Sequence, residues 1–418
     1  MQKNRIKHKE IILIGAGLYG CLLAYFLKRK GHNITLVEKG SNLFSGFEPV
    51  KIGKYKINNG FHGIEYPRAK DLKNFLQNKM HLRLKKGVNI RKILIENEII
   101  DTKLGIRDYP SKLRKIYKLK NLKTYEGQSL NFFFKKDFLK KIDNNLKKFS
   151  NDKKISKKFV LPWFLPSNVK NKLSDEGMVF RDRVKQKKIK AYYYYPKNGL
   201  FFELNKIFSK KFKQMKINIK LNTKVVLKKG RFFLLSKETK KEISIKKYLI
   251  YNCSSSIFML HQYQNTLIKK LIKNKRYFYN ILLKIKEKNK HNKFSEIICM
   301  SKDMPLLNRI SIPHHIKQQS FNFLQLECIS RKKNIAKKDL INLKNNIKKS
   351  LNLKFCKVEG FKLSRIVYYP SDNWTKLATK KNYNFLKRNN INIKNRNFFS
   401  PINMTKAWNW AIKDSVLN

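Results

Sequence analysis

The sequence predicts an α/β protein whose first domain is built on a parallel sheet. Two observations carry this prediction: a strand, turn, helix and strand follow one another over residues 10–37, and another α/β block follows after about residue 190. An aliphatic, β-branched run over 10–14 predicts a strand, apolar residues at helical spacing over 18–30 predict a helix, and 33–37 is again extended. Gly31 predicts the end of the helix. This βαβ unit requires a right-handed crossover between two parallel strands.

Length and composition limit the class of protein. The chain has 418 residues, more than the about 250 to 300 at which one hydrophobic core usually stops growing, so we expect two domains. Lys and Arg number 96 against 27 Asp and Glu, which gives a formal charge of +69, while 42% of the residues are hydrophobic. That apolar fraction excludes a disordered basic tail. The lysines are spread through almost every segment, so we attribute the charge to a lysine bias and expect any nucleic-acid binding to be nonspecific.

The cysteines and the apolar segments indicate where the protein works. Five widely separated cysteines predict neither a disulfide framework nor a zinc site, which favours a reducing compartment, and we expect the cytoplasm. The apolar stretch 11–27 is shorter than the about 20 residues that span a bilayer, so no transmembrane segment is expected. His314 and His315 would point to opposite faces of a strand, and no metal site is expected there. The cysteines are Cys21, Cys253, Cys299, Cys328 and Cys356.

A glycine-rich turn joins the first strand to the first helix. Gly15, Gly17 and Gly20 form a GxGxxG pattern, in which the first glycine permits a tight turn, the second lets backbone approach a pyrophosphate, and the third lets helix and strand pack closely. The helix N-terminus offers N–H groups to the phosphates. Glu38, at the end of the second strand, is placed to accept hydrogen bonds from ribose hydroxyls. This GxGxxG pattern and the acid that follows it, called the fingerprint from here on, predict FAD or NAD binding. The alternative is a glycine-rich turn that serves only packing.

Two segments follow the glycine turn: 38–47, with Ser45, Gly46 and Phe47 near its end, and 59–63, which reads Asn-Gly-Phe-His-Gly. Together with the glycine turn, they resemble a known family, the FAD-dependent amine oxidase and protoporphyrinogen oxidase-like flavoproteins, which are close in fold to the UDP-galactopyranose mutases. Gly46 matches the second glycine of the family's Gly-Gly pair, Ser45 replaces the first, and Phe47 stands near where a basic residue is common. The segment 59–63 resembles the family's glycine and histidine turn beside the isoalloxazine. The resemblance implies that the glycine and histidine of this turn contact FAD.

The central part of the chain extends the resemblance. The segment 195–200, Tyr-Pro-Lys-Asn-Gly-Leu, is followed by a helix and by the strand 217–227, and it resembles the segment with which the family re-enters its flavin domain. Val225 matches the valine whose backbone meets the adenine. The run 248–254 is similar to the family's later strand that returns toward the cofactor. Dehydrogenases that bind only NAD do not require the segments 195–227 and 248–254, so the resemblance implies FAD.

The C-terminal match is weaker. The segment 398–404 is similar to the last FAD strand and helix start, with Ser400 and Pro401 where the family usually has a glycine followed by an acid. Residues at helical spacing from Met404 onward predict a helix. The fingerprint and the resemblance together predict these cofactor-binding residues: Gly15, Ala16, Gly17, Leu18, Tyr19, Gly20, Glu38, Lys39, Gly46, Gly60, His62, Val225 and Met404.

The predicted fold is a Rossmann-like FAD-binding domain that is discontinuous in sequence, with an interleaved α+β substrate domain. We assign 1–78, 195–256 and 355–418 to the FAD-binding domain and 79–194 and 257–354 to the substrate or cap domain. Further expected elements are helices over 130–149, 200–215 and 337–351, strands over 217–227 and 357–369, and a strand-rich run over 277–329.

Three functions remain open at this stage. The first is an FAD-dependent oxidoreductase of the amine oxidase-like class, which removes a hydride from an unidentified small substrate. The second is a redox-neutral flavin mutase acting on a nucleotide sugar, suggested by Asn395 and Arg396 before Met404. The third is a catalytically degenerate flavoprotein fold that binds a polyanion or a protein partner.

Other side chains give weaker signals. The tyrosine run 192–195 predicts either an aromatic pocket wall or a strand with two tyrosines inward and two outward. Arg181, Arg183 and Arg365 could bind an anion, but in so basic a chain each is more readily a solvated surface residue. Four scattered acids have no spacing that pairs them as general acid and base, namely Asp101, Asp108, Glu296 and Glu327.

Overall fold

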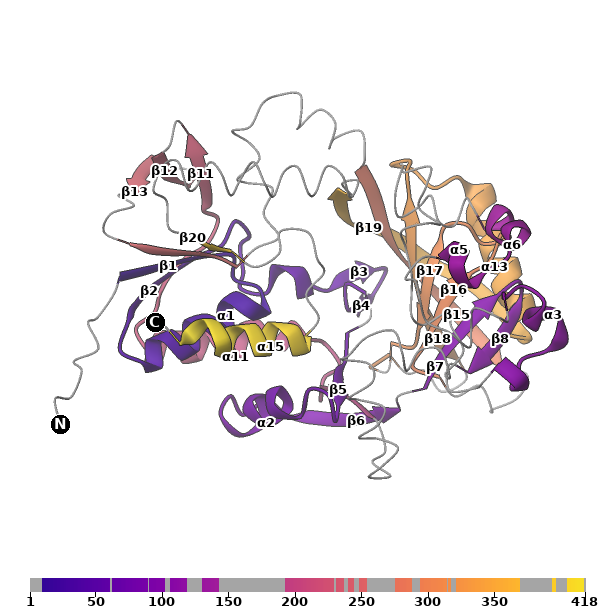
Figure 1. Ribbon diagram of the computed structural model, residues 1–418, viewed down its shortest axis with the longest axis horizontal. Coiled ribbons are helices and arrows are strands. Elements are labelled where there is room, and N and C mark those ends of the chain that lie inside the picture. The colour runs from indigo at the N-terminus through magenta and orange to yellow at the C-terminus, as the bar shows by residue number, and fades with distance from the viewer. Residues whose placement is uncertain are drawn as a thin grey trace.

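The computed structural model shows two lobes, each built around a large sheet (Figure 1). The structure describes residues 10–60, 62–88, 90–101, 106–118, 130–142, 192–228, 231–236, 240–243, 248–253, 275–287, 294–313, 315–316, 321–368, 393–395 and 404–416.

The first lobe contains a five-stranded sheet in the order β10-β2-β1-β14-β20, and all of its strands are parallel. The central strand β1 has four buried aliphatic residues in a row, as expected for a parallel strand covered on both faces. The sheet gathers strands from distant parts of the chain, which confirms the predicted α/β fold with a sequence-discontinuous parallel sheet. Its members are β1 (Glu10–Ile14), β2 (Asn33–Val37), β10 (Asn218–Lys220), β14 (Leu249–Asn252) and β20 (Ile393–Asn395).

Three helices lie together beside this sheet: α1 (Leu18–Arg29), α11 (Glu203–Gln214) and α15 (Met404–Ser415) (Figure 1). The helix α2 (Lys70–Asn78) packs at the edge of the same core. An aromatic cluster joins α1, α2 and α15, with the Phe26 ring 5.7 Å from Phe75 and 5.4 Å from Trp408. The C-terminal helix is therefore an integral part of the first lobe.

The second lobe is built on a seven-stranded sheet in the order β19-β15-β18-β17-β16-β7-β8. The helix α13 (Lys337–Ser350) covers one face, where its buried residues Leu343 and Ile347 join the apolar side chains of the central strands. The strand-rich run predicted over 277–329 is confirmed. The strands are β7 (Arg91–Ile95), β8 (Glu98–Asp101), β15 (Lys275–Glu287), β16 (Glu296–Met300), β17 (Leu307–Ser311), β18 (Asn322–Ser330) and β19 (Leu353–Tyr368).

Short strands lie between the lobes and beside them (Figure 1). A hairpin pairs β3 (Val50–Ile52) with β4 (Tyr55–Ile57), and a small sheet has the order β5-β9-β6. Its strands are β5 (Ile64–Tyr66), β6 (Leu84–Val88) and β9 (Tyr192–Pro196), and a further sheet contains β11 (Lys224–Lys228), β12 (Arg231–Leu235) and β13 (Lys240–Ile243). The second lobe also has the short helices α3 (Ser111–Arg114), α5 (Leu130–Phe133) and α6 (Lys136–Lys141), and two 3-10 turns occur at Ser45–Phe47 and Ile106–Asp108.

Two predicted elements differ in the structure. The single strand expected over 217–227 is two strands, β10 and β11, in different sheets. Asn222 takes φ +49 between them, which Asn tolerates, and its N–H donates to the Gly40 carbonyl, so the chain turns beside the segment that follows β2. The helix expected from residue 130 is broken into α5 and α6, because Phe134 forms a bridge with Tyr117. Residues 143–149 lie outside the described residues.

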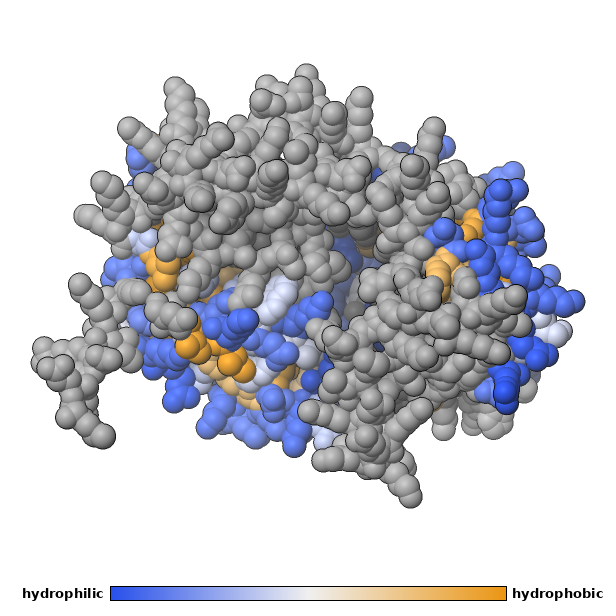
Figure 2. Space-filling view, in the orientation of Figure 1, coloured by the Kyte–Doolittle hydropathy of each residue, from blue (hydrophilic) through white to orange (hydrophobic). Residues whose placement is uncertain are grey.

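On the face shown in Figure 2, most of the coloured surface of both lobes is hydrophilic, with apolar patches among it. Among the described helices, none has both the length and the apolar character that crossing a bilayer requires.

Candidate functional site

The glycine turn between β1 and α1 has the geometry that the fingerprint predicts. Gly15 takes φ +101 and donates its N–H to the Val37 carbonyl at 2.7 Å, which ties the turn to the end of β2. A Cβ placed on Gly20 would lie 2.0 Å from the Gly15 carbonyl oxygen, so only glycine fits where helix and strand meet. Glycine is thus required at Gly15 by the backbone conformation and at Gly20 by the close packing of helix and strand.

Gly17 differs from both, because a Cβ built on it meets no atom within 4 Å. It is the N-cap residue of α1, where no side chain caps the helix and no acidic residue occupies the first turn. The helix N-terminus therefore opens onto free space with N–H groups and a partial positive charge, which suits an anionic phosphate. This is the cradle into which a pyrophosphate would fit.

Glu38 is 6% exposed and lies directly beside this cradle. Its Oε2 accepts the Ala16 N–H at 2.8 Å, and its Oε1 accepts the Gly40 N–H at 2.9 Å. The sequence predicts a ribose ligand at this position, whereas the structure shows the carboxylate holding the chain's own turn. A carboxylate can accept about four hydrogen bonds, so these contacts leave capacity for a ribose hydroxyl.

Other predicted residues of the first block lie around the same turn. Leu18 and Tyr19 are buried at the start of α1, and the Tyr19 hydroxyl donates to Asp414 Oδ2 of α15 at 2.6 Å. Lys39 is exposed after β2. Gly46 is exposed too, and a Cβ on it would meet no atom within 4 Å.

The two predicted residues from later segments are also in the first lobe. Val225 is buried in β11, just after Thr223, whose N–H donates to the Glu38 carbonyl at 2.9 Å. The segment that contains Val225 is thereby fixed beside the end of β2. Met404 begins α15 and packs against the core of the lobe.

The predicted turn at 59–63 lies where the two lobes meet. Gly60 takes φ +92, and a Cβ on it would lie 3.4 Å from Glu327 Oε2 of β18. The His62 ring packs 4.7 Å from Phe47 and 5.9 Å from Phe201, measured between ring centroids. The structure therefore brings the histidine beside Phe47 of the preceding segment and the start of α11, while Phe61 lies outside the described residues.

Burial lowers the pKa of His62 to about 4, against the opposing effects of Glu327 and the Asn59 carbonyl, while Arg365 and Arg309 lower it further. The Nε2 atom lies 3.0 Å from that carbonyl oxygen. The imidazole is consequently neutral at pH 7.

A row of charged side chains crosses the sheet of the second lobe and was missed by sequence reasoning. Arg91 of β7 is paired with Glu296 of β16, Arg309 of β17 lies 3.3 Å from the same carboxylate, and Arg309 Nε lies 3.8 Å from Glu327 Oε1. The Tyr193 hydroxyl of β9 donates to Glu296 at 3.2 Å and accepts from Arg91 at 2.7 Å. The sequence shows no spacing that pairs Glu296 and Glu327 as general acid and base, and the structure adds that cross-strand register joins the two carboxylates through Arg309.

The two carboxylates of this charged row are buried, and its two arginines are half-buried. Burial would by itself raise the pKa of Glu296, which is 1% exposed, but Arg91 and Arg309 hold it below its ordinary value. The sequence signal that could have revealed it is a charged residue within each of several apolar strands. Its pairing was hidden because the partners are distant, with Arg91 and Glu296 separated by 205 positions.

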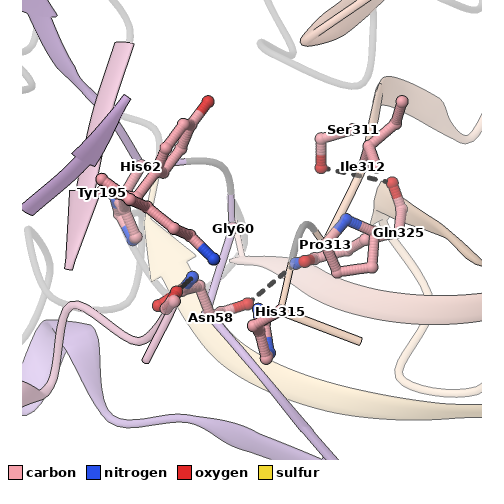
Figure 3. A pocket seen from close by; sticks show the side chains of 11 residues that line it. Asn58, Gly60, His62, Tyr195, Ser311, Ile312, Pro313, His315 and Gln325 are labelled. Carbon is pink, nitrogen blue, oxygen red and sulfur yellow. Dashed lines mark hydrogen bonds between the residues drawn. The ribbon is translucent and has the colours of Figure 1, made fainter. Parts of the chain in front are cut away.

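A small pocket lies between the predicted turn and the sheet of the second lobe. Figure 3 shows His62 and Tyr195 on one side of it and Ser311, Pro313 and Gln325 on the other. Its closed part measures about 20 Å³, which is room for about one water molecule. Polar and apolar groups contribute about equally to its walls.

The tyrosines at 192–195 form strand β9, which lies between β5 and β6. Tyr193 and Tyr195 are buried and Tyr192 and Tyr194 half-buried, so the alternating strand is confirmed, and Tyr195 also lines the pocket. Arg365 is exposed with its guanidinium 4.6 Å from the Phe278 ring. Several residues lie outside the described residues: Arg181, Arg183, His314, Arg396, Ser400 and Pro401.

Comparison with known proteins supports a dinucleotide-binding first domain. A family described as an NAD(P)-binding Rossmann-like domain matches residues 13–78, which include the glycine turn, Glu38 and the turn at 59–63. Among curated proteins, no match to this sequence was found.

Solved structures of several enzymes have a fold similar to that of this chain. A reduced UDP-galactopyranose mutase superposes with a TM-score of 0.68 at 13% identity over 98% of this chain and 95% of that one. A protein from Exiguobacterium sp. 255-15, assigned provisionally as a protoporphyrinogen oxidase, gives 0.55 at 10% identity over 98% and 99%. A variant of putrescine oxidase gives 0.56 at 8% identity over 98% of each chain. The predicted resemblance is thus confirmed at the level of fold.

Proposed function

We propose that this chain is an FAD-dependent oxidoreductase of the amine oxidase-like class that removes a hydride from a small substrate. The observation that carries the proposal is the open space at Gly17, at the uncapped N-terminus of α1 and beside Glu38. A turn built only for packing would have no reason to keep glycine where a side chain meets nothing. The shared fold with flavoproteins supports FAD as the dinucleotide.

The residues present fit this cofactor. Gly15 to Gly20 would hold the pyrophosphate, Glu38 the ribose, Val225 the adenine end, and Gly46 and Met404 the middle of the molecule. Gly60 and His62 would lie beside the isoalloxazine, which supplies the hydride acceptor when FAD is bound. His62, neutral through burial, would keep the ring's surroundings free of an added positive charge.

The substrate would enter where the lobes meet. We propose a cofactor domain formed by 1–78, 195–256 and 355–418 and a substrate domain formed by 79–194 and 257–354. The strand β19, which falls at the start of the range 355–418, pairs along its length with β15 of the second lobe. Tyr195, Ser311 and Gln325 line the pocket between the lobes. This pocket has room for about one water molecule, so a substrate would need a wider opening between the lobes than the pocket itself.

Cofactor identity and turnover test this proposal. The purified protein should be yellow, and heat or acid should release FAD, identified by mass spectrometry. Anaerobic mixing with a panel of small amines and alcohols should bleach the flavin band with at least one of them. A protein that takes up no flavin in any reconstitution would contradict the proposal.

A second candidate is a redox-neutral flavin mutase that acts on a nucleotide sugar. The observation that favours it is the TM-score of 0.68 to the UDP-galactopyranose mutase, against 0.55 and 0.56 for the two oxidase-type structures. Protein with chemically reduced flavin should then isomerise a UDP-sugar without net consumption of reductant. Bleaching by an amine with no isomerisation would decide for the oxidoreductase.

A further inference from the structure

A polar cluster, defined as Asn58, Asn59, Asn280 and Gln325, joins the two lobes at the turn. Gln325 Nε2 donates to the Asn58 carbonyl at 2.8 Å and to Asn280 Oδ1 at 2.7 Å. Asn280 Nδ2 in turn donates to Asn59 Oδ1 at 3.3 Å. Gln325 and Asn280 are 3% and 2% exposed, and they come from the adjacent strands β18 and β15. The backbone carbonyl fixes the orientation of the Gln325 amide, since only its NH₂ group can donate there.

The side chain of Asn58 extends the cluster to the central segment of the chain. Its Nδ2 donates to the Gly199 carbonyl at 2.8 Å, and its Oδ1 accepts the Phe201 N–H at 2.9 Å. Asn58 therefore holds together the N-terminal block, the chain entering α11 and, through its carbonyl, the second lobe.

The same carbonyl also shapes the turn itself. The Gly60 N–H donates to the Asn58 carbonyl oxygen at 2.9 Å, and Gly60 has φ +92. The Asn59 carbonyl lies 3.0 Å from His62 Nε2, and the Phe201 ring packs 5.9 Å from the imidazole. A change at the Asn58 carbonyl would therefore alter both the Gly60 backbone and the surroundings of His62.

We propose that Gln325 is a positioning residue that sets the conformation of the turn 58–63 from the sheet of the second lobe. The functional meaning rests on the proposed function, because that turn is where His62 and Gly60 would meet the flavin. The Asn58 carbonyl accepts two hydrogen bonds, one from the Gly60 N–H within the turn and one from Gln325 Nε2. Gln325 thereby acts on the flavin surroundings through the turn, with no direct contact between Gln325 and the cofactor.

Hydrogen exchange in the flavin-free protein tests this role independently of FAD binding. Gln325→Met keeps the volume and removes both donors, and the Gly60 and Phe201 amides should exchange about tenfold faster, as expected for the loss of one hydrogen bond. The matched control is Gln214→Met at the exposed end of α11, which should leave both amides unchanged. In protein loaded with FAD, Gln325→Met should shift the flavin absorption maximum while binding is retained.

Two results would overturn the inference. Unchanged exchange at Gly60 and Phe201 would do so, as would a rise that is equal across the whole chain, because that pattern reports general destabilisation. If the methionine variant does not fold, Gln325→Asn supplies the second test, since the shortened amide withdraws the donor and keeps a polar group. An absence of FAD from the wild type would contradict the proposed function, while the exchange data would still decide on Gln325.

Discussion

Gly17 and Gly20 stand three positions apart in one turn and have opposite requirements. A Cβ at Gly20 would meet the Gly15 carbonyl oxygen at 2.0 Å, whereas a Cβ at Gly17 meets nothing within 4 Å. Gly20→Ala should therefore destabilise the fold by about 1 to 3 kcal/mol through overpacking against backbone, and Gly17→Ala should cost much less. Urea unfolding of the two variants measures this. Equal destabilisation by both substitutions would contradict the assigned roles.

His62 gives a prediction about pH. Its pKa is about 4 in the folded protein and 6.5 in the unfolded chain, so the unfolded state binds the proton more readily between these values. The stability that the neutral imidazole contributes is complete above pH 6.5, is lost as pH falls toward 4, and amounts to about 3 kcal/mol.

The matched variant for this measurement is His62→Gln, which cannot titrate. Between pH 7 and pH 4 the unfolding free energy of the wild type should fall more steeply than that of the variant. Parallel curves would show that the imidazole is not held in its neutral form.

At the scale of elements, the packing of α15 on α1 ties the C-terminus to the glycine turn. The Tyr19 hydroxyl donates to Asp414 Oδ2 at 2.6 Å, and Lys30 Nζ donates to the Ser415 carbonyl at 2.9 Å. Met404, predicted to contact the cofactor, begins the same helix. The placement of Met404 thus depends on contacts near the opposite end of α15.

Tyr19→Phe tests this link. Removing a hydroxyl that donates to a buried carboxylate should lower the unfolding free energy by about 1.5 to 3 kcal/mol. Asp414→Asn and the double variant complete a double-mutant cycle, in which the effects should be strongly non-additive because the two groups are in contact. Additive effects would mean that the two side chains are energetically independent.

Elements with local signals were predictable from sequence, and their long-range partners were not. The pattern over 10–37 identified β1, α1 and β2 with nearly their observed bounds, because strand, helix and glycine turn each follow from neighbouring residues. The break between β10 and β11 depends on hydrogen bonds to Glu38 and Gly40, which no local pattern shows. For the same reason, two long-range features could be found only in the structure. One is the contact of Gln325 with Asn58, and the other is the charged row formed by Arg91, Glu296, Arg309 and Glu327.

At the scale of the whole molecule, the chain carries a formal net charge of +69. If that charge reflects dispersed lysines, any binding to DNA or RNA should be insensitive to sequence. Its affinity should fall steeply between low and moderate salt as counterions are taken up again. Competition between unrelated oligonucleotides at rising ionic strength measures this. Sequence-selective binding that persists in moderate salt would make nucleic-acid recognition the main function.

The central claim, that the open space at Gly17 holds the pyrophosphate of FAD, is tested most directly by titrating flavin-free protein with FAD and following flavin fluorescence. The wild type should bind FAD, and Gly17→Leu should abolish binding while its circular dichroism and unfolding midpoint stay close to those of the wild type, because the leucine enters open space. Binding of FAD by Gly17→Leu with unchanged affinity would contradict the account.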